Sequence, residues 1–174
     1  MKSPLAILLS LFFLFTAPAI GAKTGDQIEP NAKLEVQSIL LDLSQNLDQF
    51  ELFQKKLEAS GQNHKSYDEN KNIWISTVLA VQAIASICEN EQDLLNLFWD
   101  LRKSRRVQYV TIRIRSLETS IQQIQNMMEQ IRINHRLLPP GLAEIHLFNK
   151  ITNRAESTIA LFQASIALID KHRS

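Results

Sequence analysis

The chain has 174 residues, of which 45% are hydrophobic and 21% are charged, with a formal net charge of +1. This length fits one domain, and the apolar content is that of an ordinary globular protein rather than of a low-complexity or repeat protein. Glycine and proline number only 4 and 5, which favours a mostly helical chain because both residues interrupt helices.

Residues 1–22 have the pattern of a secretory signal peptide. A basic second residue precedes the apolar core Leu5–Phe15, and small residues follow it. We expect cleavage after Ala22, with Ala19 as the second candidate. The core is too short for a comfortable membrane span, although its retention as an anchor stays open. The rest of the chain, 23–174, is then one exported domain, periplasmic or secreted, without a transmembrane helix.

The only cysteine is Cys88, which excludes an internal disulfide. Its apolar neighbours favour a buried thiol, and the alternative is an intermolecular disulfide. The 11 asparagines include no Asn-x-Ser/Thr sequon, which favours a bacterial envelope as the destination.

The first helix is predicted from about Pro30 to Ser60, because Gly61 suits the position after a helix end. Its expected apolar stripe is Leu34, Leu40, Leu41, Leu47, Phe50, Phe53 and Leu57. A second helix is predicted from about Tyr67 to Cys88. Residues 73–88 contain no charge, and their apolar side chains cover every face, so this helix is expected to be buried at the centre.

The third helix is predicted from an N-cap at Asn90 to Leu138, with a kink, stutter or break near Ser104 where the apolar phase changes. Its later seam comprises Val107, Val110, Ile114, Leu117, Ile121, Ile124, Met128 and Ile131. The turn 139–141 then returns a fourth helix, 142–172, antiparallel to the third. The predicted fold is all-α: an elongated antiparallel four-helix bundle with a long coiled-coil-like hairpin made by the third and fourth helices.

Charge is divided unevenly along the chain. Residues 23–100 carry 6 basic and 13 acidic residues, a net of −7, whereas residues 101–174 carry 12 basic and 5 acidic residues, a net of +7. A chain so polarised either binds itself or presents a basic surface to an anion. The basic residues concentrate in one stretch, and they are Arg102, Lys103, Arg105, Arg106, Arg113 and Arg115.

Two interpretations of this basic stretch are open. It is either a surface that binds a partner or an anion, such as lipid headgroups or a polyanionic glycan, or it pairs internally with the acidic first helix or with Glu89, Glu91 and Asp93. The opposite charges of the two halves favour internal pairing. Export, together with the lack of aromatic residues beyond Tyr109, disfavours nucleic acid.

Candidate chemistry elsewhere is sparse. His135 and His146 flank the 139–141 turn and, with Glu144, are the candidate metal ligands, but their spacing is neither that of a zinc finger nor His-Glu-x-x-His. The sequence has no Gly-rich phosphate loop, nucleophile elbow or Glu-x-x-His pair. We therefore expect no enzyme activity, metal or cofactor.

The expected function is that of an exported, non-enzymatic bundle that acts by protein–protein interaction or self-association. This expectation rests on the predicted third helix, which is longer than the helices that pack on it and would leave part of its apolar seam uncovered. The alternative is a binder of anionic envelope ligands through residues 102–115.

Overall fold

The structure, a computed structural model, describes residues 30–63, 67–100, 107–138 and 145–171. These residues form four helices and no strand: α1 (Pro30–Asn63), α2 (Tyr67–Asp100), α3 (Val107–Leu137) and α4 (Ile145–Lys171). The all-α prediction is confirmed. The predicted signal peptide lies outside the described residues, as do its cleavage sites.

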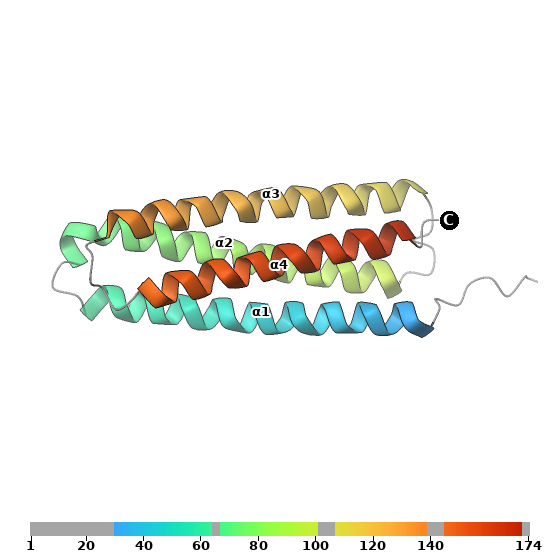
Figure 1. Cartoon of the computed structure of the whole chain (residues 1–174), viewed down its shortest axis with the longest axis horizontal. Helices are drawn as coiled ribbons and strands as arrows, with labels where there is room; N and C mark the ends of the chain where they lie inside the picture. Colours follow the sequence, from blue (N-terminus) through green and yellow to red (C-terminus); the bar gives the residue numbers. More distant parts are fainter. Residues whose placement is uncertain (1–29, 64–66, 101–106, 139–144, 172–174) are drawn as a thin grey trace, which may run out of the picture.

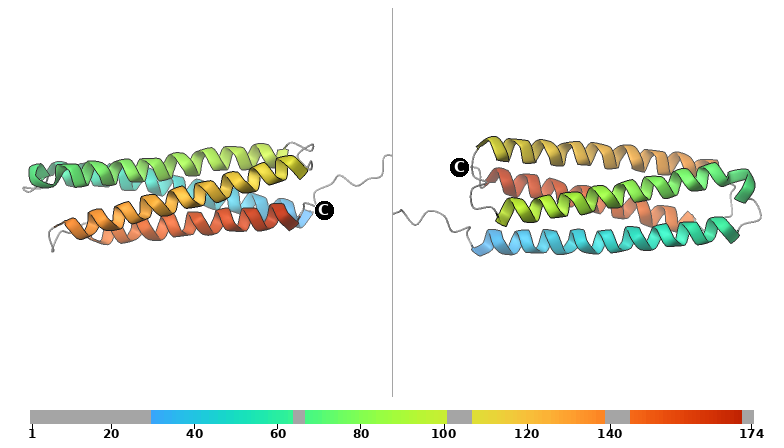
Figure 2. Two further views of the ribbon diagram at one scale, coloured as in Figure 1. Left: turned by 90° about the horizontal axis from the view of Figure 1, so that it is seen from above. Right: turned by 180° about the vertical axis from the view of Figure 1, so that it is seen from behind.

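The four helices form an elongated antiparallel bundle (Figure 1). Each helix packs against the helices that precede and follow it in the chain, and α4 closes the ring by packing on α1. The diagonal helices α2 and α4 meet only slightly. Two further views show α2 on the side of the bundle opposite α4, flanked by α1 and α3 (Figure 2).

The predicted seam between α3 and α4 is confirmed. Leu117, Ile124 and Ile131 of α3 are fully buried, as are Ile151 and Phe162 of α4. They belong to one continuous core that receives residues from all four helices. Recurrence at three and four residues places each set on one helix face, which explains why the antiparallel hairpin forms.

The predicted boundary between the second and third helices was wrong. Helix α2 continues through Asn90 to Asp100, because nothing between Cys88 and Glu91 interrupts its backbone hydrogen bonds. The break expected near Ser104 falls outside the described residues. As a result α3 has 31 residues and is shorter than α1 and α2, which have 34 each. Within the described residues α3 is therefore not the longest helix, as the expected function had assumed.

The predicted stripe of α1 was partly wrong. Leu34 and Leu41 are 65% and 61% exposed, whereas Leu43, which the prediction omitted, is fully buried. Leu43 lies seven residues before Phe50 and fourteen before Leu57, so it shares their face of the helix. Asn46 also faces the core, at 1% exposure.

Helix α2 is not the central helix that its composition predicted. It is one of four equivalent helices around the core, so only one of its faces is covered. Ile75 and Leu79 are 42% and 58% exposed on the other face. Within α2, Asn70–Trp99 is long and apolar enough to cross a membrane by length and composition, with 33% of the window buried in the bundle. A core helix of a water-soluble bundle meets the same criterion.

Candidate functional site

A buried ion pair joins α2 to α3. The guanidinium of Arg113 pairs with the carboxylate of Glu91, and the two residues are 6% and 4% exposed. Arg113 Nη2 also donates to the backbone oxygen of Glu91 at 3.1 Å. The hydroxyls of Ser116 and Ser120 donate to Glu91 Oε1 at 3.1 and 2.6 Å. The Glu91 carboxylate therefore accepts hydrogen bonds from three residues of α3 and fixes α2 against α3 at this level of the bundle.

The ion pair is not fully satisfied. Burial lowers the pKa of Arg113, and the neighbouring Glu91 charge acts in the opposite direction. Arg113 Nε has no hydrogen-bond acceptor among the described residues. A buried charge pair of this kind specifies how two helices align more than it stabilises their contact.

A second polar cluster joins α2 and α3 near the other end of the bundle. The Asn134 side chain, 3% exposed, donates to Thr77 Oγ1 at 3.0 Å and to Ser76 Oγ at 3.2 Å. Gln130 donates to Asn134 Oδ1 at 2.9 Å. With the Glu91–Arg113 pair, this cluster fixes the register of the two helices at two separate levels.

Large apolar side chains are exposed along these same two helices. Eight of the eleven exposed large hydrophobic residues in the described ranges belong to α2 or α3, and none belongs to α4. We call them the apolar residues of the α2/α3 face: Ile75, Leu79, Leu94, Leu97, Tyr109, Ile112, Ile133 and Leu137.

Helical spacing places these residues beside the line where α2 and α3 meet. Leu79 lies three residues after Ser76, and Leu94 lies three residues after Glu91, both of which contact α3. On α3, Ile112 lies four residues before Ser116, which contacts α2. Residues three or four apart are neighbours on a helix surface. The right-hand view of Figure 2 shows α2 in front with α3 beside it.

The antiparallel pairing divides the apolar residues into two patches. Leu94, Leu97, Tyr109 and Ile112 lie at the end of the bundle where α2 ends and α3 begins. Ile75, Leu79, Ile133 and Leu137 lie towards the opposite end. The level of the second patch is set by the contact of Asn134 with Thr77.

The middle of the α2/α3 face carries no charge. Residues 73–88 of α2 and 119–128 of α3 contain no Asp, Glu, Lys or Arg. The two runs overlap over residues 83–88 of α2 and 123–128 of α3, because the contacts of Glu91 with Ser120 and of Thr77 with Asn134 set the relative level of the two antiparallel helices. The exposed side chains in this overlap are hydroxyls and amides: Ser86, Gln123, Gln125 and Asn126.

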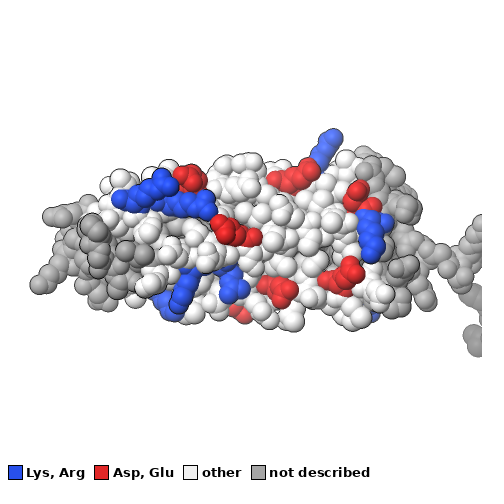
Figure 3. Space-filling view, in the orientation of Figure 1, with Lys and Arg blue, Asp and Glu red and all other residues white. Residues whose placement is uncertain are grey.

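The opposite side of the bundle is different in character. Figure 3 looks onto the α4 side, where groups of Lys and Arg and of Asp and Glu are scattered between uncharged areas. One pair on this side joins Arg132 of α3 to Glu156 of α4 at 3.0 Å. The exposed leucines of α1, including Leu41, lie among charged residues such as Asp42 and Asp48. Helix α4 also contains an uncharged run, at residues 157–169, but among the described residues it exposes no large hydrophobic side chain.

The predicted basic site is divided by the structure. Arg113 points inward to Glu91, as the internal-pairing interpretation expected. Arg115 is exposed on α3. Arg102, Lys103, Arg105 and Arg106 lie outside the described residues (101–106). Binding of anions by Arg115 and this neighbouring segment stays a prediction, which salt-sensitive binding to anionic liposomes would test.

The remaining candidates do not converge on one site. His135 stacks on Phe148 with ring centroids 4.9 Å apart, and His146 is exposed on α4. Glu144 lies outside the described residues. No group of three or more His, Cys, Asp or Glu side chains suited to a metal ion occurs within the described ranges.

Cys88 lies within the bundle interior. It is fully buried, and its thiol donates to the backbone oxygen of Leu43 at 3.5 Å. Burial raises the pKa of the thiol to about 12, and the nearby Glu89 charge raises it further. The prediction of a buried thiol is confirmed. An intermolecular disulfide through Cys88 would require α1 and α2 to separate first.

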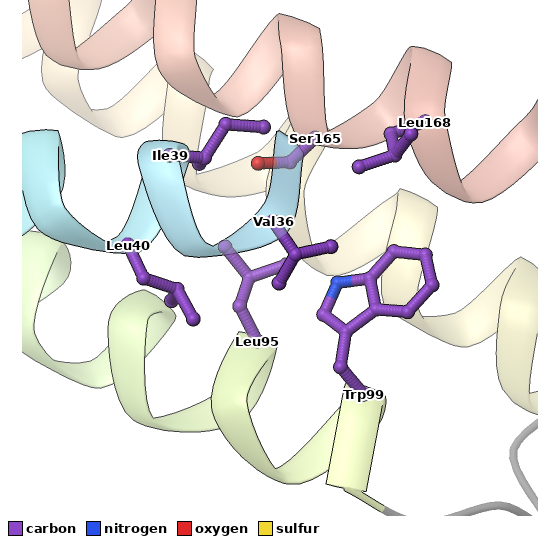
Figure 4. A pocket seen from close by; sticks show the side chains of 7 residues that line it. All are labelled: Val36, Ile39, Leu40, Leu95, Trp99, Ser165 and Leu168. Atoms are coloured by element: carbon purple, nitrogen blue, oxygen red, sulfur yellow. The ribbon is translucent and has the colours of Figure 1, made fainter. Parts of the chain in front are cut away.

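A shallow apolar depression lies where α1, α2 and α4 meet (Figure 4). Trp99 and Leu95 approach it from α2, Val36 from α1, and Leu168 and Ser165 from α4. A single hydroxyl, that of Ser165, is the polar group in this lining besides the tryptophan ring nitrogen. Such a lining offers a small molecule little to orient it.

Comparison with protein families, with curated proteins and with solved structures found no match to this chain.

The exposed apolar surface of the α2/α3 face was not predicted from the sequence. The uncharged run 73–88 was noted, but it was attributed to burial on all sides. A second uncharged run lies at 119–128 on α3. The alignment of α2 with α3 makes the two runs overlap over residues 83–88 and 123–128, which no local pattern predicts.

Proposed function

We propose that the protein is a non-enzymatic helical module that acts by protein–protein interaction, and that its docking surface is the α2/α3 face. The observation that carries the proposal is the placement of eight exposed large apolar residues on these two helices, around a charge-free middle. Contiguous exposed apolar surface on a soluble domain commonly marks an interaction site.

The composition of the face supports a protein partner. Interface centres are poor in charged residues and contain aromatic and large aliphatic side chains, with hydrogen-bonding groups around them. The α2/α3 face has leucine, isoleucine and one tyrosine at 42–60% exposure, together with amide and hydroxyl groups. This is the chemistry of a surface that becomes buried on docking.

The buried clusters beneath the face support a preformed surface. The Glu91–Arg113 pair and the Asn134–Thr77 contact hold α2 against α3 at both ends of the charge-free segment. A surface held in one arrangement loses less conformational entropy when it binds. With the predicted signal peptide, we place this module outside the cytoplasm, in a bacterial envelope or its surroundings.

The test is site-specific photo-crosslinking in the cells that make the protein. A photoreactive amino acid in place of Leu79 is expected to form covalent adducts with a partner chain. The matched control is the same substitution at Leu41, which is equally exposed, at 61% against 58%, but lies on α1. Adducts from both positions alike, or from Leu41 alone, would overturn the proposal.

A further inference from the structure

We infer that the bundle is built from two helical hairpins that separate from each other as units while each hairpin stays folded. The N-terminal hairpin is α1 with α2, and the C-terminal hairpin is α3 with α4. Of the four interfaces between neighbouring helices, α1/α2 and α3/α4 lie within a hairpin, whereas α2/α3 and α1/α4 lie between the hairpins. The inference comes from the different chemistry of these two kinds of interface.

Buried polar contacts are concentrated between the hairpins. Eight polar or charged residues are buried within the described ranges, and seven of them bond from one hairpin to the other. The eighth, Ser165, donates to the backbone oxygen of Leu161 in its own helix. The seven are Thr77, Glu91, Arg113, Ser120 and Asn134 at the α2/α3 interface, and Asn46 and Thr158 at the α1/α4 interface.

The α1/α4 interface matches the α2/α3 interface on the opposite side of the bundle. The Asn46 side chain of α1 donates to Thr158 Oγ1 at 3.0 Å and accepts from Arg154 Nη1 at 2.8 Å. The hairpins are therefore joined by polar groups along both of the lines where they meet.

The interfaces within each hairpin are held differently. Between α1 and α2, the thiol of Cys88, a weak donor, bonds to the backbone oxygen of Leu43. Between α3 and α4, the ion pair of Arg132 with Glu156 lies on the surface. The contact of α1 with α2 is the most extensive in the bundle, and that of α1 with α4 is the least extensive between neighbouring helices.

Water makes the polar interfaces the easier ones to open. A buried hydrogen bond contributes little net free energy, because water forms equivalent bonds once the groups separate. A buried ion pair likewise repays little more than its desolvation. Arg113 Nε, which has no acceptor among the described residues, gains one from water on opening. Apolar contacts have no such compensation, so the interfaces within the hairpins are the costlier ones to break.

The closed bundle is nevertheless the main form. The two hairpins share one apolar core, in which the rings of Trp74 and Phe148 lie 6.1 Å apart between α2 and α4. Separation is therefore a minor opening that needs less free energy than complete unfolding. Cooperative units that open in this way often coincide with supersecondary motifs such as a hairpin.

Separation has a consequence for the α2/α3 face, and this consequence rests on the proposed function. Four of the eight apolar residues of the face belong to α2 and four to α3, so each hairpin carries half of them. The docking surface is then complete only while the hairpins are closed.

The first experiment measures thiol labelling of the purified full chain. Ser120→Cys and Thr158→Cys, each in a Cys88→Ala background, place one thiol in the α2/α3 and one in the α1/α4 interface. Denaturant titration gives the global unfolding constant of each chain, and circular dichroism establishes that it is folded. Both thiols are expected to give an opening constant at least tenfold above that global constant, by the same ratio. Labelling of both thiols through global unfolding alone would overturn the inference.

Two other outcomes of this experiment would also overturn it. Labelling at one interface but not at the other would mean that a single helix detaches. Division of the bundle into an α2–α3 pair and an α4–α1 pair would instead expose the native Cys88, which contacts α1, while both interface thiols stay protected.

The second experiment tests whether the two interfaces open together. Asn46→Ala weakens the α1/α4 interface and is expected to raise the opening constant of Ser120→Cys at the opposite interface by the same factor as the global unfolding constant. The matched control is Leu41→Ala on the exposed side of α1, which is expected to leave that opening constant unchanged. An unchanged opening constant in the Asn46→Ala chain would show that the interfaces open independently, and would overturn the inference.

These experiments are separate from the test of the proposed function. Labelling is measured on the purified chain without a partner, so its failure leaves the α2/α3 face as a docking surface. Absence of photo-adducts at Leu79 removes the docking surface, and labelling of both interface thiols above the global constant would still support the separation of the hairpins.

Discussion

The buried pair of Glu91 and Arg113 makes the strongest prediction about how the bundle is specified. Glu91→Leu leaves the Arg113 cation buried without its counter-charge, and Arg113→Met leaves the Glu91 anion buried with only two serine hydroxyls. Each partner is at most 6% exposed, so water does not replace what is lost. Removing one member of a buried pair costs about 3 to 5 kcal/mol in free energy of unfolding.

The double variant is expected to behave differently. Glu91→Leu combined with Arg113→Met removes both charges and fills a similar volume with apolar atoms. The hydroxyls of Ser116 and Ser120 can then donate to backbone oxygens four residues earlier in α3. We expect the double variant to lie within about 1 to 2 kcal/mol of the wild type, because the cost of desolvating two charges disappears with them.

Chemical denaturation followed by circular dichroism measures the free energy of unfolding of the wild type, the two single variants and the double variant. The expected result is a double variant that unfolds at a higher denaturant concentration than either single variant. Losses that simply add, so that the double variant is the least stable of the three, would refute the argument that the two buried charges exist for each other. In that case the charges would contribute through separate contacts.

Two further predictions concern residues of the core. Because the Cys88 thiol has a pKa of about 12 in the bundle and about 9 when unfolded, the unfolded chain loses this proton first as pH rises. Stability is therefore expected to fall between pH 9 and 12 by up to about 1.4 kcal/mol per pH unit more in the wild type than in Cys88→Ala, and equal slopes would contradict the burial of the thiol. Leu43→Ala is expected to lower the free energy of unfolding by about 2 to 5 kcal/mol and Leu41→Ala by less than about 0.5, and the reverse order in denaturation would show that α1 is rotated.

The parts of the fold that could be predicted are those with a single regular stripe. Helices α3 and α4 each have an unbroken apolar stripe at spacings of three and four, which marks the inward face even though α3 carries four further large apolar residues outside its stripe. In α1 the choice was ambiguous, because Leu40, Leu41 and Leu43 stand close together. The face containing Leu43 prevails since it also contains Phe50 and Leu57.

The boundary of α2 and the site could not be predicted for a different reason. Asn90 and Glu91 resemble a helix start when only their neighbours are considered. The role of Glu91 depends on Arg113, which is 22 residues away and arrives only when α3 packs on α2. The charge-free overlap of α2 and α3 likewise depends on that alignment, which two buried polar clusters determine and which no local pattern contains.

The division of charge between the two halves of the chain has a partial explanation in the bundle. Helices α1 and α2 come from the acidic half and α3 and α4 from the basic half, so each half supplies two adjacent helices. The contacts of α2 with α3 and of α1 with α4 join the halves. One ion pair between described residues of the two halves joins Arg113 to Glu91.

The central claim is that the α2/α3 face is covered when the protein works, and carbene footprinting tests it most directly. Intact cells and the dilute purified protein would be labelled in parallel, and the labelled peptides quantified by mass spectrometry. The account predicts several-fold lower labelling in cells for the peptides containing Ile75, Leu79, Leu94 and Leu97, with unchanged labelling around Leu41. Equal labelling of the α2/α3 face in both conditions would contradict it.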